Sequence, residues 1–289
     1  MVQYRPVRQV SDPAPPDVSV VLPCFRSAAL ARRSADRLAR FLGDRFGSYE
    51  VVVVDDGGGD FDASWPEEGT VRLLRLPANR GKGAAVRAGM LSCRGRVRIF
   101  TDVDLPFGLE PIAAAVRFIE ERGFHLAVGD RTLPESSYAL DVGWRRRIAS
   151  GLFSKLVGIF VTGGFFDTQC GFKAFRGDVA QALFGISRID RFAFDVELLY
   201  LALVYRTDIK RISVKLRDNE TSTMRLLRDS ARMLIDVARI RLFAFRGAYR
   251  CPALARIVAD DFAQVAGMTA ESPLEEEPAG RLLQVHRSR

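Results

Sequence analysis

Two aspartates one residue apart follow a short apolar stretch near the middle of the chain. Asp102 and Asp104 stand in the run Ile-Phe-Thr-Asp-Val-Asp-Leu-Pro-Phe at 99–107. Carboxylates at positions i and i+2 of an extended segment point to the same side, where they can share one divalent cation. Hard oxygen ligands suit Mg²⁺ or Mn²⁺, and such ions often hold a substrate diphosphate. The pair is therefore a predicted metal site, although Asp-x-Asp is also a common loop sequence.

Two other polar stretches lie next to apolar ones. Asp55-Asp56-Gly57 follows four valines, and Asn79-Arg-Gly-Lys-Gly83 leads into a segment with helical spacing. Carboxylates accept hydrogen bonds from base N–H groups and ribose hydroxyls. Glycines let the backbone approach a phosphate, and Lys82 would add positive charge near a helix N-terminus. Each stretch also has a plainer interpretation, as an acidic helix cap or a simple turn.

Alternating strands and helices must position these side chains. Apolar segments that predict strands lie at 18–22, 71–76, 97–101 and 126–129, and a further strand begins at Glu50. Segments with helical spacing lie between them, at 28–43, 82–91 and 112–122. This order predicts an α/β fold with a mostly parallel central sheet and helices on both faces. Ligands of open α/β sheets bind at the carboxyl ends of the strands. We therefore expect the aspartate pair and the two glycine-containing loops to converge there.

The composition favours an anionic partner. The 289 residues are 48% hydrophobic and 27% charged, which are globular values, and their net charge is +8. Four separated cysteines without metal-type spacing predict free thiols, and only two histidines argue against a histidine-rich zinc site. The polar, proline-rich N-terminus does not resemble a signal peptide, and no apolar run reaches the roughly 18 residues that suggest a membrane span.

Longer motifs resemble a known family. Val18-Ser-Val-Val-Leu-Pro23, Val53-Val-Asp-Asp-Gly57 and Thr101-Asp-Val-Asp104 are similar to the first strand, nucleotide-binding loop and metal motif of glycosyltransferase family 2, whose fold is called GT-A. The resemblance covers residues 17–220. Within it, Asp167-Thr-Gln-Cys-Gly-Phe-Lys173 and Phe194-Asp-Val-Glu-Leu-Leu199 look like the polyprenyl-phosphate sugar synthases, especially the dolichyl-phosphate β-glucosyl branch and its mannosyl relatives.

The resemblance implies an inverting transfer of a hexose from a nucleoside diphosphate sugar to a polyprenyl monophosphate. It favours UDP-glucose as the donor, with GDP-mannose next. An Mg²⁺ or Mn²⁺ ion on Asp104, with Asp102 near the ribose or the metal, would offset charge on the leaving diphosphate. The acceptor phosphate is already anionic at neutral pH, with a second pKa of ~6, so a strong general base is not required.

The resemblance also implies roles for individual residues. Contacts with the nucleotide sugar are expected for Pro23, Asp55, Asp56, Lys82, Asp102 and Gln169. Catalytic roles are expected for Asp104, Arg131 and Asp195, although Asp195 could equally cap a helix. Contacts with the acceptor phosphate are expected for Arg131, Arg147 and Lys173. The chain departs from the family after its first strand, where Phe25-Arg26-Ser27 replaces the usual Tyr-Asn-Glu.

Four parts of the chain are expected: a flexible leader at 1–16, a GT-A domain at 17–222, amphipathic helices at 223–266 and a disordered tail at 267–289. Within 224–246, an apolar stripe and an arginine stripe lie side by side, formed by Leu227, Ala231, Leu234, Ala238, Leu242 and Phe245 and by Arg225, Arg228, Arg232, Arg239 and Arg246. This pattern is typical of a helix at a membrane surface, and residues 145–166 resemble it. It also fits a helix that packs on the domain and exposes a basic face.

The leading hypothesis is a peripheral enzyme at the cytoplasmic face of a membrane, without a transmembrane span. One alternative is a family-2 transferase with another acceptor, such as a glycolipid, polysaccharide or secondary metabolite, which would need a general base near Asp195. A more remote alternative is a basic nucleic-acid-binding protein. No nucleic-acid motif appears, and the arginines are not interleaved with exposed aromatic residues, so nucleic acid is not an expected partner.

Overall fold

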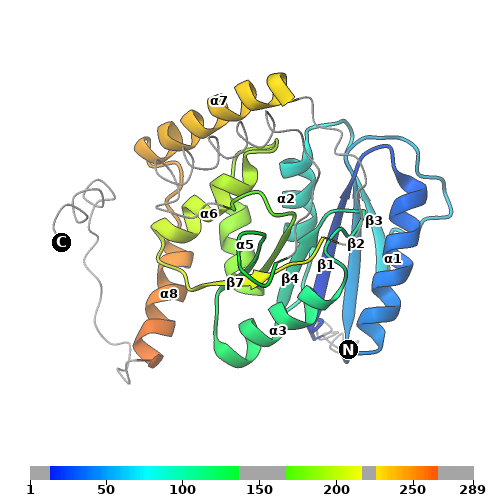
Figure 1. Ribbon diagram of the computed structural model, residues 1–289, viewed down its shortest axis with the longest axis horizontal. Coiled ribbons are helices and arrows are strands. Elements are labelled where there is room, and N and C mark those ends of the chain that lie inside the picture. The colour runs from blue at the N-terminus through cyan, green and yellow to red at the C-terminus, as the bar shows by residue number, and fades with distance from the viewer. Residues whose placement is uncertain (1–13, 137–166, 217–225, 266–289) are drawn as a thin grey trace, which may run out of the picture.

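A computed structural model of the chain describes residues 14–136, 167–216 and 226–265. Its centre is a seven-stranded sheet with the order β3-β2-β1-β4-β6-β5-β7 (Figure 1). The strands are β1 (Val18–Cys24), β2 (Tyr49–Asp55), β3 (Val71–Arg75), β4 (Val97–Thr101), β5 (Leu126–Asp130), β6 (Phe172–Arg176) and β7 (Ile209–Ser213). The helices are α1 (Ala28–Gly43), α2 (Lys82–Ser92), α3 (Glu110–Arg122), α5 (Gly177–Ile186), α6 (Phe194–Val204), α7 (Leu226–Phe245) and α8 (Pro252–Val265).

The predicted α/β fold is confirmed. Strands β1, β2, β3 and β4 pair in parallel, with Val18 opposite both Tyr49 and Val97. Every residue of β1 is buried, which explains its apolar, β-branched sequence. The five expected strands and the three helices expected between residues 28 and 122 are all present, with ends that differ by at most two residues.

One strand runs against its neighbours. β6 is antiparallel to both β4 and β5, while β5 and β7 are parallel. The chain that leads into β6 therefore lies at the same edge of the sheet as the carboxyl ends of the parallel strands. This reversal brings the segment at 167–171 to the edge where ligands are expected.

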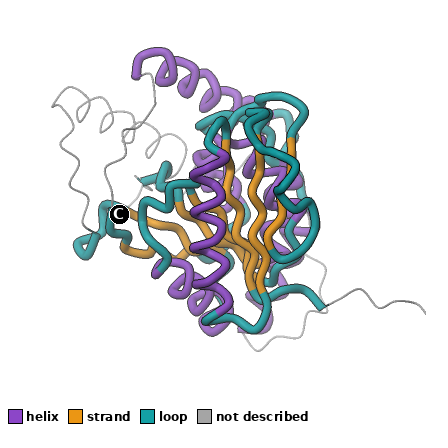
Figure 2. Tube along the Cα trace, turned by 90° about the vertical axis from the view of Figure 1, so that its right-hand side faces the viewer, coloured by secondary structure: helices purple, strands orange, loops and turns teal. Residues whose placement is uncertain are grey.

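Helices lie on both faces of the sheet (Figure 2), and the buried apolar residues form two hydrophobic clusters. One contains the buried residues of α1 and α3, and the other contains those of α2, α5 and α6. Helix α2 comes very close to the strands, because a methyl group at Gly89 would overlap the side chains of Val21 and Val54. Glycine at this position thus allows the helix to lie directly on β1 and β2.

The last two described helices pack on this domain. α7 runs across the carboxyl ends of the strands, and α8 descends along the side of the molecule (Figure 1). Ile240 of α7 and Leu254 of α8 are fully buried in the second cluster. The buried ring of His125 accepts a hydrogen bond from the N–H of Asp208 and lies 2.8 Å from Asp261 of α8. Residues 1–13 of the expected leader at 1–16, and the expected tail at 267–289, lie outside the described residues. No helix in the described part of the chain is long and apolar enough to cross a membrane.

Candidate active site

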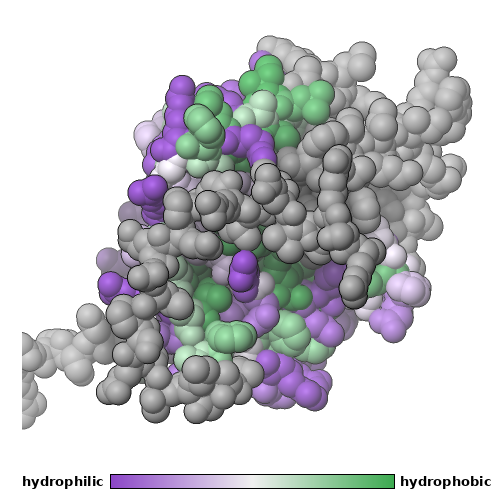
Figure 3. All heavy atoms as spheres, turned by 90° about the vertical axis from the view of Figure 1, so that its left-hand side faces the viewer, coloured by the Kyte–Doolittle hydropathy of each residue, from purple (hydrophilic) through white to green (hydrophobic). Residues whose placement is uncertain are grey.

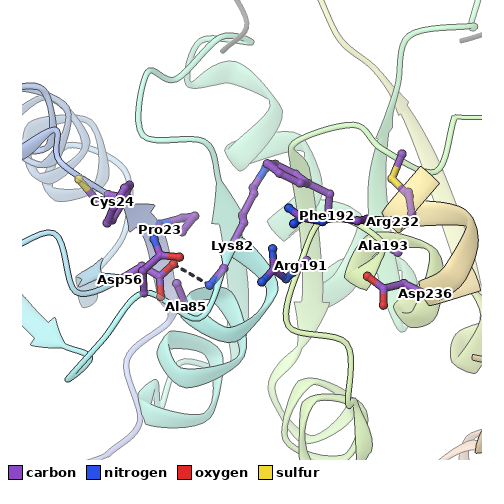
Figure 4. Close-up of a pocket in the computed structure, with 14 residues that line it drawn as sticks. Pro23, Cys24, Asp56, Lys82, Ala85, Arg191, Phe192, Ala193, Arg232 and Asp236 are labelled. Atoms are coloured by element: carbon purple, nitrogen blue, oxygen red, sulfur yellow. Dashed lines mark hydrogen bonds between the residues drawn. The ribbon is translucent and has the colours of Figure 1, made fainter. Parts of the chain in front are cut away.

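A pocket of about 380 Å³ opens at the carboxyl ends of β1 and β2, beside the N-terminus of α2. Figure 4 shows Lys82 between Pro23 and Asp56 on one side and Arg191 and Phe192 on the other. The walls are formed by Pro23, Cys24, Phe25, Asp56, Asn79, Gly81, Lys82, Ala85, Arg191, Phe192, Ala193, Arg232, Met233 and Asp236. Of the residues expected to contact the nucleotide sugar, Pro23, Asp56 and Lys82 line this pocket.

Asp56 joins the two glycine-containing loops. Its Oδ1 accepts a hydrogen bond from the N–H of Arg80 at 2.9 Å, and its Oδ2 accepts one from the N–H of Gly81 at 2.8 Å. Asp55 folds its own loop in a similar way, because its Oδ1 accepts a 2.7 Å hydrogen bond from the N–H of Gly58. A carboxylate oxygen can accept more than one hydrogen bond, so both groups keep acceptor capacity for a ligand.

Residues 25–27, where the chain departs from the family sequence, lead into the start of α1. Ser27 makes no side-chain hydrogen bond that caps α1. The carboxylate of Asp60 instead accepts a 2.8 Å hydrogen bond from the N–H of Ala28. A negative charge at a helix N-terminus is favourable, so Asp60 stabilises the start of α1 from a distant loop.

Lys82 and Asp102 form an ion pair between the glycine-containing loop and the end of β4. Their side chains are 23% and 34% exposed, so both remain accessible from solvent. Burial alone would lower the pKa of Lys82, but the negative charges of Asp102, Asp195 and Asp104 outweigh it and raise the pKa. Lys82 is therefore a protonated cation over the neutral pH range.

The chain from Asp102 to Leu105 is a turn, which corrects the expectation of an extended segment. The N–H of Leu105 donates a 2.9 Å hydrogen bond to the carbonyl of Asp102, and Leu105 has a φ of 50°. The side-by-side placement expected for residues i and i+2 of a strand therefore does not apply to Asp102 and Asp104. Asp104 is exposed. Among the described residues, no group of three or more His, Cys, Asp or Glu side chains is arranged to hold a metal ion.

Lys173 and Asp195 form an ion pair inside the protein. Lys173 is 0% exposed, and its ammonium donates to Asp195 Oδ1 at 2.5 Å and to the carbonyls of Thr168 and Cys170 at 3.0 and 2.9 Å. The ammonium thus has its three protons engaged, so the lysine is not placed to bind the acceptor phosphate as expected. Burial raises the pKa of Asp195, against the opposing effect of the charges of Lys173 and Lys82.

Asp195 and Glu197 face different partners although both stand in the first turn of α6. The carboxylate of Glu197 accepts hydrogen bonds from the N–H groups of Arg188 and Ile189 and from the hydroxyl of Tyr249. Glu197 thereby connects α6 to the chain between α7 and α8. This is a structural contact, whereas the pair of Asp195 with Lys173 lies beside the pocket loops.

Arg131 is held by Asp167. Its Nε and one terminal nitrogen donate to the carboxylate of Asp167, the latter at 2.6 Å, and its backbone N–H donates to the same group. The arginine side chain is 26% exposed, and it is not among the residues that line the pocket. Arg147, the other arginine expected at the acceptor phosphate, lies outside the described residues.

Gln169 lies next to the wall that α7 contributes. Its amide nitrogen is 2.9 Å from the sulfur of Met233, and Met233 lines the pocket. The sequence did not single out the segment at 191–193 or Met233 and Asp236 as parts of the site. The only signal for them was indirect, since 191–193 precedes Phe194-Asp195 and the other two stand beside Arg232 in the arginine-rich helix.

Asp56, Lys82 and Asp102 thus lie together at the carboxyl ends of the strands, where the resemblance to a GT-A glycosyltransferase implies the donor site. The chain belongs to the glycosyl transferase family 2, whose family model matches residues 19–184. The predicted family and fold are thereby confirmed. Among curated proteins, the chain is similar to the dolichyl-phosphate beta-glucosyltransferase of Dictyostelium discoideum, with 30% identity over 81% of this chain and 76% of that protein. It is 34% identical to the protein of the same name from Drosophila melanogaster, over 69% of this chain and 66% of the relative.

Solved structures of other transferases share the fold. Mannosyl-3-phosphoglycerate synthase from Rubrobacter xylanophilus matches with a TM-score of 0.53 and 19% identity, over 80% of this chain and 75% of the other. Glucosyl-3-phosphoglycerate synthase from Mycobacterium tuberculosis, in complex with Mn²⁺, UDP and glucosyl-3-phosphoglycerate, matches with a TM-score of 0.52 and 17% identity, over 77% and 78% of the two chains. At these identities the likeness shows the fold alone.

Proposed function

We propose that this enzyme transfers glucose from UDP-glucose to a polyprenyl monophosphate of the dolichyl type. The observation that carries the proposal is the similarity to proteins named dolichyl-phosphate beta-glucosyltransferase, which extends over 81% of this chain in the Dictyostelium case. The pocket supports it, because a nucleotide-sized cavity lies at the strand ends where α/β folds bind such ligands. GDP-mannose is the second candidate donor.

Mg²⁺ or Mn²⁺ is the cofactor that we propose for the donor diphosphate. The donor set fits a hard cation, because Asp104 is exposed and Asp102 is partly exposed at the end of β4. Two carboxylates suffice when diphosphate oxygens and water complete the coordination. The structural relative from Mycobacterium tuberculosis was solved with Mn²⁺ and UDP. When bound, the cation would neutralise charge on the diphosphate leaving group.

Three charged residues of the chain would bind the donor or hold the loops of the pocket in place. Lys82 is protonated at neutral pH and would place a positive charge near the diphosphate. Asp56 fixes both loops that surround the nucleotide end of the pocket. Asp195 would keep its ion pair with Lys173 and orient the segment at 168–170 rather than remove a proton. This agrees with an acceptor phosphate that is already anionic, with a second pKa of ~6.

The outer face of α7 is the part of the enzyme that we propose to touch the membrane. Leu234, Ile235, Leu242 and Phe245 are 50%, 60%, 43% and 91% exposed, while Met233 and Ile240 pack inward. Figure 3 shows hydrophobic and hydrophilic side chains together at the end of the molecule that carries α7. The exposed Arg246 adjoins this face, and it could contribute about 1 kcal/mol near an anionic lipid surface. The side chains of Leu227, Arg228 and Ala231 and the segment 145–166 lie outside the described residues.

A transfer assay tests the proposed reaction. Purified full-length protein is incubated with labelled UDP-glucose, Mg²⁺ and a short polyprenyl phosphate, and a parallel reaction contains labelled GDP-mannose. Label should move into the lipid phase with UDP-glucose. Label from GDP-mannose alone would reassign the donor, and no label from either would reject the proposed acceptor. Asp104→Ala should abolish transfer, whereas Asp36→Ala, at an exposed position of α1, should leave it unchanged.

Flotation with anionic vesicles tests the membrane contact. Ile235→Glu and Phe245→Glu place charges on the outer face of α7 and should reduce the bound fraction. Phe262→Glu is the matched control, because Phe262 is 73% exposed on α8. If Ile235→Glu and Phe245→Glu bind the vesicles as well as Phe262→Glu does, α7 is not the contact surface.

A further inference from the structure

Two arginines, Arg191 and Arg232, line the pocket. Arg191 lies in the loop before α6, and Arg232 lies on α7, and both side chains are exposed. Neither forms an ion pair within the described ranges. Their neighbours differ, since Arg80 and Arg87 both pair with Asp190.

Of the other three charged residues that line the pocket, Lys82 and Asp236 are paired, and Asp56 is a carboxylate on the opposite side of the pocket from Arg191 (Figure 4). Lys82 is paired with Asp102, and Asp236 is paired with Arg239 at 3.2 Å. Asp56 accepts two backbone hydrogen bonds from the neighbouring loop. Arg191 and Arg232 therefore leave an excess of positive charge along the wall formed by the α6 loop and α7, which favours an anionic ligand.

The two arginines come from different elements on the same side of the pocket, Arg191 from the loop before α6 and Arg232 from α7 (Figure 4). The side chain of Arg191 lies over the glycine-containing loop, because a methyl group at Gly81 would come within 3.2 Å of its Cγ. Arg232 precedes Met233 and the exposed apolar residues Leu234 and Ile235. An anion held between the arginines would thus lie close to Lys82 on one side and to the apolar outer face of α7 on the other.

We infer that Arg191 and Arg232 bind the phosphate of the lipid acceptor, whose hydrocarbon chain leaves the pocket along the outer face of α7. The inference rests on the proposed function, and it gives the acceptor phosphate a site in place of the buried Lys173. Guanidinium groups suit phosphate, because they offer paired N–H donors in a fixed geometry. The diphosphate of the donor could also bind guanidinium groups. It carries no apolar chain, however, that would contact the exposed apolar residues next to Arg232.

Separate binding measurements distinguish the two phosphate sources. Arg191→Gln, Arg232→Gln and the double variant of the full-length protein are titrated calorimetrically with farnesyl phosphate and, in a second series, with UDP in the presence of Mn²⁺. Each single variant should bind farnesyl phosphate about 10-fold more weakly, as expected for the loss of a hydrogen bond to a charged group. UDP affinity should not change. Arg191→Lys and Arg232→Lys should recover part of the lost affinity.

Arg256→Gln is the control, because Arg256 is exposed on α8 and does not line the pocket. Weaker UDP binding by the arginine variants would assign the pair to the donor and overturn the inference. Unchanged binding of both ligands would overturn it as well. A wild-type protein that binds farnesyl phosphate through these arginines but transfers no sugar to it would reject the proposed function and leave the phosphate site standing.

Discussion

Lys173 donates to Asp195 across 2.5 Å, and the two side chains are 0% and 5% exposed. The lysine comes from the reversed strand β6, and the aspartate comes from the first turn of α6. The same ammonium also donates to the carbonyls of Thr168 and Cys170. One buried cation therefore fixes a turn and a helix start next to the candidate active site.

Removal of this cation should strongly destabilise the fold. Lys173→Met leaves the carboxylate of Asp195 buried without a partner, which should cost about 3–5 kcal/mol of unfolding free energy. The double variant Lys173→Met with Asp195→Leu should regain much of that loss, because it removes both charges. Urea denaturation measures each variant. Arg117→Met, which breaks an exposed pair with Glu121, is the control and should cost less than about 1 kcal/mol. A similar small cost for Lys173→Met would contradict the importance of the buried pair.

Gly171 should control the position of Asp102. A methyl group at Gly171 would overlap the carboxylate of Asp102, so Gly171→Ala must displace that carboxylate from Lys82. We expect affinity for UDP with Mn²⁺ to fall about 10-fold, equivalent to roughly 1.4 kcal/mol, while the circular dichroism spectrum remains that of a folded protein. Calorimetric titration measures the affinity.

Gly185→Ala provides the control for that variant. Gly185 is on α5, and a methyl group there would meet nothing within 4 Å. The substitution should raise stability by up to about 1 kcal/mol through helix propensity and leave UDP affinity unchanged. Equal UDP affinity in both variants would disprove the proposed link between Gly171 and Asp102.

Asp130 should give stability that depends on pH. Burial alone would raise the pKa of Asp130, but hydrogen bonds from Arg211 and Thr132 outweigh it and hold the pKa below 3.8. Because the pKa is lower in the folded state, the Asp130 carboxylate contributes its full share of the unfolding free energy above the unfolded-state pKa. This contribution disappears as pH falls through the folded-state pKa. Asp130→Asn should therefore cost about 1–3 kcal/mol at pH 7 and progressively less below pH ~4.

Urea denaturation from pH 7 down to the lowest pH at which both proteins fold measures this dependence. Asp178→Asn is the comparison, because its pair with Arg176 is half exposed and should contribute little at any pH. A loss for Asp130→Asn that stays constant down to pH 3 would show that the carboxylate charge is not responsible.

The cysteines should differ in reactivity. Burial raises the pKa of Cys24, Cys93 and Cys170 to about 12, and all three are buried free thiols. Cys251 is only partly buried. Since the thiolate is the reactive form, a disulfide reagent at pH 8 should modify Cys251 first and the other three only after unfolding in urea. Peptide mapping identifies the modified thiols, and rapid modification of Cys24 in the folded protein would contradict this order.

Much of the fold could be predicted because the central strands are rich in apolar, β-branched residues. β1 and β2 are buried on both faces, and their sequences show it. β6 has no such signal, because Lys173 interrupts its apolar residues. The strand tolerates that charge only because Asp195 reaches it from a distant part of the chain, and such a partner is not visible in a local sequence pattern.

The candidate site was predictable to a similar extent. Strand order alone brought Asp56, Lys82 and Asp102 together, and the structure contains the expected meeting of their loops. The turn after β4 was not predictable, because Leu105 adopts a left-handed conformation that leucine rarely takes. Arg191 lies at the pocket through the path of the loop before α6, which no periodicity describes.

The reversed direction of β6 has a consequence for redesign of the site. Residues that follow β2 and β3 supply the Asp56 and Lys82 side, whereas residues that precede β6 supply Gln169, which contacts Met233 on α7. The two sides are therefore carried by segments that can be exchanged independently. A library confined to position 169 would vary the wall near α7, because Thr168 and Cys170 are buried, while the loops that hold Asp56 and Lys82 keep their sequence. Acceptor preference could then be selected without rebuilding the nucleotide end.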